Sequence, residues 1–313
     1  MTESVVLDGI DRGLLHALQL DGRVPFSRVA DVLGVSETTV ARRYKRLRAV
    51  AALRVVGVAN GVLFGRTAWT LRLRCTPDVA MPLAKALAKR PDIFWVHVMS
   101  GGAEISCHAQ LAPGEESILL EKLPRASRVL DVSAHSVLNA FTLPSDWSRL
   151  RCLDDDQVAS LRPEEPRPAR TEVDAADLTL LALLAVDGRA SCAELAAQAR
   201  LSESTVRRRL DLLRHNGVVS YQVDIPAAVL GFGTQARLYL TVPPHALVDV
   251  GKRLARHEET SFVAATTGPT NLVAVVACRD SGDLYRYLTE RVAPLRAITS
   301  LETAVLMRTV KQG

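Results

Sequence analysis

The sequence predicts an α+β protein built from two tandem units, each with three helices followed by a βαββαβ segment. A stretch of 38 residues recurs 166 residues further along the chain, which indicates an internal duplication. Apolar residues follow a helical period in the first part of each unit and alternate at period two between helical segments in the second part. With 313 residues, 48% of them hydrophobic, the chain has enough apolar material for packed cores.

The duplication is clearest around an Asp-Gly-Arg tripeptide at 21–23, which recurs at 187–189. Residues 11–48 align with residues 177–214 without a gap, and 16 of these 38 positions are identical. After a one-residue slip the similarity continues more faintly into the second part, where Trp95 aligns with Phe262. Three prolines among charged residues at 163–168 predict a surface linker between the units. The expected domains are helical regions at 1–57 and 173–224, a linker at 146–172, and sheet domains at 62–145 and 229–313.

The first part of each unit is predicted to be a (winged) helix-turn-helix. Apolar spacing predicts a first helix that Asp21 ends, a second over 26–33, and a third that starts at Ser36. In the second copy, Ser191 and Glu194 form a capping-box pattern, and Ser202 opens the third helix. A short tri-helical unit with a tight turn before its last helix is typical of DNA-binding helix-turn-helix domains.

The polar face of the third helix is basic. Residues 36–54 carry six basic residues and one acidic residue, and this charge of +5 equals the net charge of the chain. Such a face can be merely solvated, but here it occurs twice, with small hydroxyls in the first turn, where a recognition helix meets base edges. We therefore predict binding to double-stranded DNA. The candidate DNA-binding residues are Ser36, Thr38, Thr39, Arg42, Arg43, Arg46, Ser202, Ser204, Thr205, Arg208 and Arg209.

The second part of each unit alternates strands and helices. In the first copy we expect strands at 67–75, 93–99, 104–111 and 129–141, with helices at 77–90 and 115–123. The second copy repeats this order with strands at 236–242, 261–267, 271–277 and 298–308, and helices at 244–257 and 282–291. The order βαββαβ is the ferredoxin-like motif, a four-stranded antiparallel sheet with helices on one face. The other face of each sheet needs a partner, because its apolar residues would otherwise lie in water.

These motifs resemble the Lrp/AsnC transcriptional regulators. The segments that carry the resemblance are Val-Ser-Glu-Thr-Thr-Val-Ala-Arg-Arg at 35–43 and Leu-Ser-Glu-Ser-Thr-Val-Arg-Arg-Arg at 201–209. The resemblance covers nearly the whole chain except the linker. It implies a DNA-binding regulator whose sheet domains dimerise, either within one chain as a pseudo-dimer or between chains, and whose chains assemble further into homo-oligomers, as dimers or tetramers.

The resemblance also implies a small-molecule effector, often an amino acid, near a Gly-x-x-Asp turn between the second and third strands. The matching positions are Gly101 and Glu104 in the first copy and Gly268 and Asn271 in the second. Both glycines match, but the acid is replaced by Glu in one turn and Asn in the other. Glu104 is thus the one carboxylate that could pair with the ammonium group of an effector, unless both segments are simply hairpin turns.

Two other functions compete with DNA binding. Sirohaem decarboxylases share this architecture, but they carry an aromatic-rich segment where residues 270–275 of this chain have no aromatic residue. A small-molecule-binding module with a degenerate helix-turn-helix is the other alternative, and the paired arginines at 42–43 and 208–209 argue against it. His97, His108 and His135 fall on three predicted strands, where a metal site is conceivable, although structural histidines are more common.

Several classes are excluded by composition and motifs. The five cysteines are never closer than 32 residues, so neither a disulfide framework nor zinc-finger spacing is present. The sequence contains no Ser-His-Asp order or phosphate-binding loop of the usual kinds. It also has no apolar run that could span a membrane, and its acidic start lacks the order of a secretory signal. We therefore expect a cytoplasmic protein that is not an enzyme, with no catalytic residues, no cofactor and no metal.

Overall fold

The structure, a computed structural model, describes residues 6–50, 52–115, 128–142 and 147–311. Most of the helix expected at 115–123 lies outside the described residues. The chain forms two compact units, and each combines segments from both copies of the duplication. Residues 1–64 and 148–230 form what we call the head unit, and residues 65–147 and 231–312 form the barrel unit.

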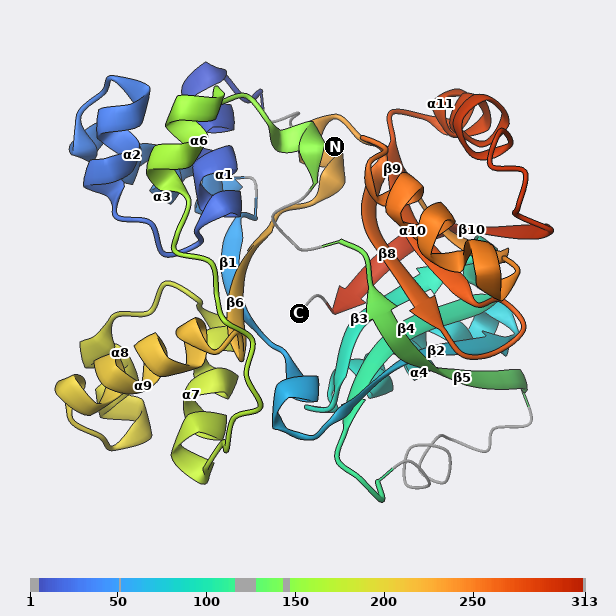
Figure 1. Cartoon of the computed structure of the whole chain (residues 1–313), viewed down its shortest axis with the longest axis horizontal. Coiled ribbons are helices and arrows are strands. Elements are labelled where there is room, and N and C mark those ends of the chain that lie inside the picture. The colour runs from blue at the N-terminus through green and yellow to red at the C-terminus, as the bar shows by residue number, and fades with distance from the viewer. Residues whose placement is uncertain (1–5, 51, 116–127, 143–146, 312–313) are drawn as a thin grey trace. The chain divides into compact units, whose positions relative to one another are not determined.

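The head unit contains both helix-turn-helix domains, as three helices and a strand from each copy (Figure 1). The first copy supplies α1 (Gly9–Leu20), α2 (Phe26–Leu33), α3 (Glu37–Val50) and β1 (Arg54–Ala59). The second supplies α7 (Ala175–Val186), α8 (Cys192–Ala199), α9 (Glu203–His215) and β6 (Val219–Asp224). The apolar faces expected on the third helices are buried, with Val40, Leu47 and Val206 fully inside. All six predicted helices are therefore confirmed, whereas neither strand was predicted.

Side-chain caps set the start of the helices. Ser191 and Glu194 form the predicted capping box at the start of α8, and Ser202 accepts a hydrogen bond from the N–H of Thr205 at the start of α9. A further capping box opens α1, where the N–H of Asp11 donates to Asp8 at 2.9 Å and the Asp11 carboxylate accepts from the N–H of Asp8. The second copy repeats this Asp-x-x-Asp box at the start of α7. Because capping fixes where each helix begins, the two copies share one helical register.

Strands β1 and β6 pair with each other as an antiparallel ribbon that links the two helical bundles. Val56 lies opposite Gln222, and these two positions are equivalents in the 166-residue repeat. A local twofold axis therefore passes through this pair. The first helix of each copy packs on the strand of the other copy, α1 on β6 and α7 on β1. The two helix-turn-helix domains of the head unit, which we call the heads, thus form a pseudo-symmetric pair within one chain.

The segment predicted to be a surface linker is partly helical. Helix α6 (Asp155–Leu161) packs on α1 and α2, and its Leu161 is fully buried. Just before it, His16 of α1 accepts hydrogen bonds through Nδ1 from the backbone N–H groups of Cys152 and Leu153, at 3.2 and 3.1 Å. The proline-rich stretch that follows runs extended beside the end of α9, where the N–H of Arg167 donates to the carbonyl of His215 at 2.7 Å.

The barrel unit joins the two predicted ferredoxin-like sheets into one closed eight-stranded barrel. The first copy supplies β2 (Thr67–Cys75), α4 (Pro77–Ala88), β3 (Ile93–Met99), β4 (Glu104–Leu111) and β5 (Val129–Ala140). The second supplies β7 (Thr234–Thr241), α10 (Leu247–Ala255), β8 (Thr260–Thr266), β9 (Leu272–Cys278), α11 (Ser281–Arg286), a π-helical turn (Tyr287–Val292) and β10 (Ser300–Lys311). The last strand of each copy closes the barrel by pairing with the other copy, β5 with β8 and β10 with β3. Strand β10 runs past its predicted end at 308 because its last residues pair with β3.

Each sheet has one apolar face under its helices and one face toward the barrel interior. Leu71, Ile105 and Cys107 belong to the core under α4, and Leu238 and Ala274 belong to the equivalent core under α10. The alternate residues on the same strands line the interior, which buries the sheet faces that the sequence left without a partner. Within the described residues, no helix is long and apolar enough to cross a membrane. All five cysteines are free.

Candidate nucleic-acid interface

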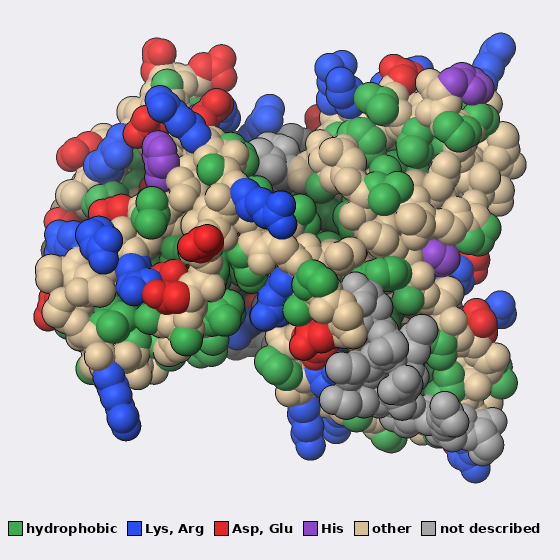
Figure 2. Space-filling view, turned by 60° about the horizontal axis from the view of Figure 1, so that its bottom comes forward, with side chains coloured by type: hydrophobic (Ala, Val, Ile, Leu, Met, Phe, Trp, Pro, Cys, Tyr) green, Lys and Arg blue, Asp and Glu red, His purple; other side chains and the backbone are tan. Residues whose placement is uncertain are grey.

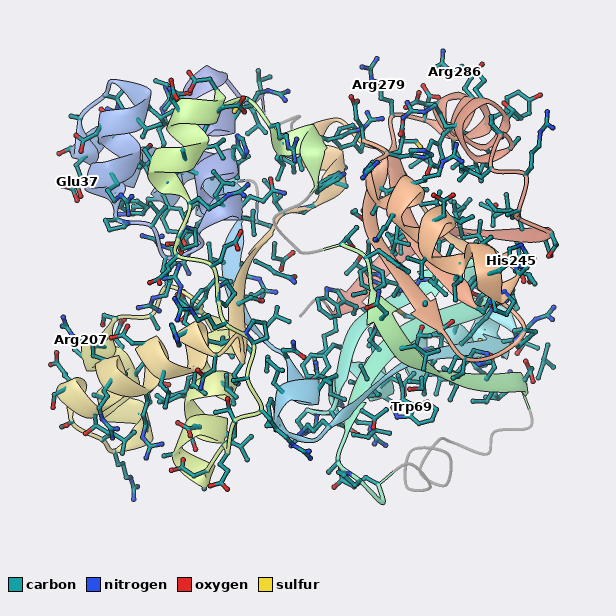
Figure 3. All side chains as sticks on the ribbon, in the orientation of Figure 1. Glu37, Trp69, Arg207, His245, Arg279 and Arg286 are labelled. Atoms are coloured by element: carbon teal, nitrogen blue, oxygen red, sulfur yellow. The ribbon has the colours of Figure 1, made fainter. Side chains whose placement is uncertain are left out.

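The outer face of each third helix carries basic side chains that point into solvent. Arg42 and Lys45 on α3 are exposed, as are Arg207 and Arg208 on α9. Within the described ranges, none of the four forms an ion pair with a carboxylate. Figure 3 shows the Arg207 side chain directed away from its bundle. Unpaired cationic groups on an exposed helix face are available to contact phosphates and base edges.

Arg43 and Arg209, which the sequence offers as DNA contacts, are instead bound to carboxylates of their own head. Arg43 Nη1 lies 2.7 Å from Asp8 Oδ2, and Arg209 Nη1 lies 2.9 Å from Asp174 Oδ2. The same ion pair therefore occurs in both copies, between the third helix and the cap of the first. The N–H of Asp11 and the Arg43 guanidinium both lower the pKa of the Asp8 carboxyl, so this pair is ionised at neutral pH.

Arg46 is engaged in the same way. Its guanidinium contacts Asp11, whose side chain is fully buried and also lies 3.5 Å from Arg43. A buried carboxylate needs such partners, because burying an unpaired charge is costly. Leu212 takes the place of Arg46 in the second copy, so there Arg209 alone pairs with Asp177, at 2.8 Å. These arginines hold the third helix on the first, and we expect their exposed neighbours to contact DNA instead.

The hydroxyls of the first turn divide into two groups. Ser36 and Ser202 are N-caps, since each accepts a hydrogen bond at 3.2 Å from the N–H three residues later. The side chains of Thr39 and Thr205 are half-buried and bond to these caps. The caps therefore orient the turn, and we expect the exposed Thr38 and Ser204 to reach a base edge, with the Ser204 hydroxyl also 3.0 Å from that of Ser202.

The repeated Asp-Gly-Arg tripeptide joins the two heads to each other. Arg23 Nη1 donates to the carbonyl of Gly188 at 2.7 Å, and Arg189 Nη1 donates to the carbonyl of Gly22 at 2.7 Å. Arg23 Nη2 also reaches the carbonyl of Ala190, at 2.9 Å. Each arginine thus binds the backbone of the equivalent turn in the other copy. The sequence predicted the tripeptide as a repeated helix end, and its presence in both copies was the one signal of this further role.

The aspartates of the same tripeptides also pair across the copies. Asp21 lies 2.7 Å from Arg214 of α9, and Asp187 lies 3.5 Å from Arg48 of α3. Arg48 and Arg214 are equivalent positions near the ends of the recognition helices. Each recognition helix is therefore tied to the turn of the opposite head, which fixes the two helices relative to one another.

Glu104, the carboxylate proposed to meet an effector, is already engaged within the barrel. It is 3% exposed, accepts a hydrogen bond from the Tyr239 hydroxyl at 2.8 Å, and lies 2.7 Å from Arg72 Nη2. Arg72 also contacts Glu302 and stacks over the Tyr239 ring, with 4.3 Å from its Cζ to the ring centroid. The Glu104 side chain points into the interior and links the two sheets, so it is not free to bind an ammonium group.

The other predicted effector residues have structural contacts as well. Asn271 bonds to both the N–H and the carbonyl of Val242, at 2.9 and 2.8 Å, and so holds the end of β7. Gly268 has a φ of 97° and packs against the His135 ring, where a Cβ would lie 2.2 Å from Nδ1. Gly101 also has a positive φ, 70°, with open space beside it. The two glycines therefore allow the positive φ angles that these turns require.

The three histidines of the first sheet lie on separate strands and form no metal site. Among the residues described, no group of three His, Cys, Asp or Glu side chains could hold a metal ion. His97 Nδ1 lies 3.3 Å from the Thr309 hydroxyl, and His108 Nε2 lies 2.9 Å from Arg237 Nη2. Because the guanidinium donates, His108 accepts through Nε2 and carries its proton on Nδ1.

Basic and acidic side chains are interspersed on the face of the molecule shown in Figure 2. Figure 2 shows Lys and Arg side chains scattered over the visible face among Asp and Glu side chains. A chain with a net charge of +5 and this distribution has a weak general attraction for polyanions. We therefore expect any recognition of DNA to depend on the specific side chains of α3 and α9.

Comparison with known proteins identifies the family. The model of the AsnC-type helix-turn-helix domain matches residues 7–48 and 173–214, and that of the Lrp/AsnC ligand binding domain matches residues 235–313. An HTH-type transcriptional regulator of Pyrococcus horikoshii is 30% identical over 149 residues, which cover 94% of that protein and 47% of this chain. This chain belongs to the Lrp/AsnC family.

A second relative of this Lrp/AsnC protein is the HTH-type transcriptional regulator Ptr1 of Methanocaldococcus jannaschii, 28% identical over 142 residues. That match covers 96% of Ptr1 and 45% of this chain, so the protein is about twice the length of such relatives. Among solved structures, the siroheme decarboxylase NirDL superposes with a TM-score of 0.66 at 15% identity, covering 97% of this chain and 93% of that one. At this identity the likeness shows a shared fold.

Proposed function

We propose that this protein is a DNA-binding transcriptional regulator whose single chain carries both heads of a family dimer. The observation that carries this proposal is the contrast between neighbouring arginines on the recognition helices. Arg43 and Arg209 are held by carboxylates, while Arg42 and Arg208 are exposed and unpaired among the described residues. A helix that needed its arginines for stability alone would not leave the equivalent side chain free in both copies.

The two heads present different surfaces to DNA. Lys45 of α3 is replaced by Asp211 in α9, and Ala41 of α3 is replaced by Arg207. All four positions lie on or near the outer face of their helix. Compared with α3, α9 therefore has a positive charge where α3 has none and a negative charge where α3 has a positive one. Asp211 repels phosphate where Lys45 attracts it. We therefore propose an operator with two non-identical half-sites.

Fragment selection followed by footprinting tests this proposal. Genomic fragments bound by the protein are selected, and the best is footprinted with hydroxyl radicals. We expect two protected segments in successive major grooves, with different sequences, and stronger protection at one of them. As a control, two symmetric sites are made, each with two copies of one of the half-site sequences. Both symmetric sites should bind the protein more weakly than the natural site. Equal or tighter binding to a symmetric site would show that the two heads read DNA alike.

We also propose a small-molecule effector and assembly into homo-oligomers in the cytoplasm, where the DNA is. The ligand-binding-domain match at residues 235–313 supports the effector. The turns that carry Gly101 and Gly268 remain its proposed location, through backbone contacts, since the side chains of Glu104 and Asn271 are engaged. A screen of the twenty amino acids for release of the selected DNA fragment identifies the effector.

A decarboxylase-like enzyme is the second candidate, because the fold match to the siroheme decarboxylase spans nearly the whole chain. We propose that the protein has no such activity, in line with its regulator relatives. Addition of an iron-uroporphyrin to the purified protein separates the two functions by visible spectroscopy. A regulator leaves the spectrum of the probe unchanged, whereas a spectral shift with release of carbon dioxide would establish the enzyme.

A further inference from the structure

Arg237 of β7 is a buried cation whose described partners are all neutral. It is 4% exposed and lies in the barrel interior, where its guanidinium contacts the Ser106 hydroxyl and bonds to His108 at 2.9 Å and Thr70 at 3.4 Å. It forms no ion pair with any carboxylate in the described part of the chain. The neighbouring Arg72, in contrast, pairs with two carboxylates, those of Glu104 and Glu302.

The surrounding histidines are neutral and do not balance the positive charge of Arg237. Burial and the nearby Arg237 charge lower the pKa of His97 to about 3 and lower that of His108 well below its usual value. Both imidazoles are therefore neutral at physiological pH. A buried cation without a counter-ion costs free energy, and replacing such a group by an apolar one is often stabilising. Retention of Arg237 therefore calls for a reason other than packing.

The polar side chains that face Arg237 of the second copy all come from the first copy. At the one-residue slip established by Trp95 and Phe262, Thr70 aligns with Arg237, Ser106 with Val273, and His108 with Val275. Arg237 thus contacts its own repeat equivalent, next to the pseudo-symmetry axis of the barrel. The second sheet shows that small apolar residues fill these positions adequately. The first sheet replaces them with a hydroxyl and an imidazole that both face the one added cation.

Aromatic side chains flank the same place. The His108 ring makes an edge contact with Trp95 at a centroid distance of 5.8 Å and another with Phe262 at 5.9 Å. Trp95 lies at a register shift between β3 and β4, with a φ of 46°, which is unfavourable for a residue other than glycine. Strain of this kind is retained where a side chain must be aimed at a particular place.

The imidazoles at this point of the barrel are half-buried and not fully buried. His97 and His108 each keep part of their surface accessible, although their strands line the inside of the barrel. An eight-stranded barrel has an interior just large enough for its own side chains or for one small ligand. A ligand beside His108 would meet a cationic guanidinium on one side and aromatic rings on the other.

We propose that the barrel interior binds a small organic carboxylate with an apolar ring. Its carboxylate pairs with Arg237, and its ring lies against Trp95 and Phe262. The hydroxyl of Ser106 and the imidazole of His108 hold the guanidinium in place and act as positioning residues. The residues of this site are not those of the two glycine turns, and the site requires no DNA binding by the heads.

Thermal unfolding and calorimetric titration of the full chain with benzoate and phenylacetate test the proposal, with benzamide and phenylacetamide as neutral controls of the same shape. Both carboxylates should raise Tm and bind at one site per chain, and the amides should do neither, because they lack the charge that Arg237 recognises. In Arg237→Met the carboxylate response should disappear. In Arg74→Met, which removes an exposed arginine on the same barrel, it should be retained.

The ligand-free variant provides a readout that does not depend on the choice of probe. If Arg237 serves to bind a ligand, the ligand-free Arg237→Met variant should be at least as stable as the wild type. If Arg237 instead has a structural hydrogen-bonding role, the variant should melt at a lower temperature. An earlier melt without ligand overturns the proposal, and so does a failure of both carboxylates to raise the Tm of the wild type. Equal carboxylate effects on the wild type and Arg237→Met also overturn it. None of these outcomes alters the binding of DNA fragments, which is measured separately on the same preparations.

Discussion

Replacing Gly188 by alanine is expected to lower the free energy of unfolding by about 3 kcal/mol. A Cβ at this position would lie 2.9 Å from the carbonyl carbon of Val56 and 3.0 Å from the carbonyl oxygen of Val55. These are backbone atoms of β1, so no rotamer change can relieve the overlap. The N–H of Gly188 also donates to the Val55 carbonyl at 2.7 Å, and displacing the turn would break that bond.

The matched control is Gly9→Ala at the start of α1. No atom lies within 4 Å of a Cβ built there, and alanine is the better helix former, so stability should be unchanged or slightly higher. Urea unfolding followed by circular dichroism measures both variants. The same Gly188→Ala protein should also bind DNA more weakly, because the turn sets the relation between the heads. Equal midpoints for the two variants would mean that the turn does not pack on β1.

The second large effect is expected at Arg72. Without its guanidinium, the buried Glu104 carboxylate keeps the neutral Tyr239 hydroxyl as a partner but has no cation beside it. Breaking a buried ion pair from one side costs about 3 kcal/mol or more, so Arg72→Ala should strongly destabilise the barrel unit. Arg74→Ala, two residues along the same strand and exposed, should have almost no effect.

A double variant separates the effect of the charge from the effect of packing. Adding Glu104→Gln to Arg72→Ala removes the unpaired carboxylate, so the urea midpoint should recover part of the way toward the wild-type value. If Arg72→Ala and Arg74→Ala unfold at the same urea concentration, the Arg72–Glu104 pair does not hold the two sheets together.

Local signals in the sequence predicted local structure well. Apolar spacing placed the six helices of the heads, and the Ser191–Glu194 pattern located a capping box correctly. The period-two alternation placed the strands of both sheets to within a few residues. These features depend on contacts between residues close in sequence, which is why spacing alone reveals them.

The contacts between the copies were beyond such reasoning. The β1–β6 ribbon and the bonds of Arg23 and Arg189 join residues about 165 positions apart, and hydrophobic period carries no information on such pairs. The hydrogen bond from Tyr239 to Glu104 was out of reach for the same reason, since Tyr239 comes from the other sheet. Within one helix, the difference between Arg42 and Arg43 depends on whether the acidic cap of α1 lies opposite, which only the packed structure shows.

Salt-dependent DNA binding by two double variants tests directly whether the heads bind DNA through their free arginines. Arg42→Ala/Arg208→Ala should keep the wild-type urea midpoint, bind the selected fragment more weakly, and reduce the slope of log K against log salt by roughly 0.9 for each phosphate that is no longer bound. Arg43→Ala/Arg209→Ala should instead lower the urea midpoint, because Asp8, Asp174 and Asp177 lose their cationic partner and Asp11 keeps only Arg46. Wild-type affinity and an unchanged salt slope in the first variant would contradict DNA recognition by these helices.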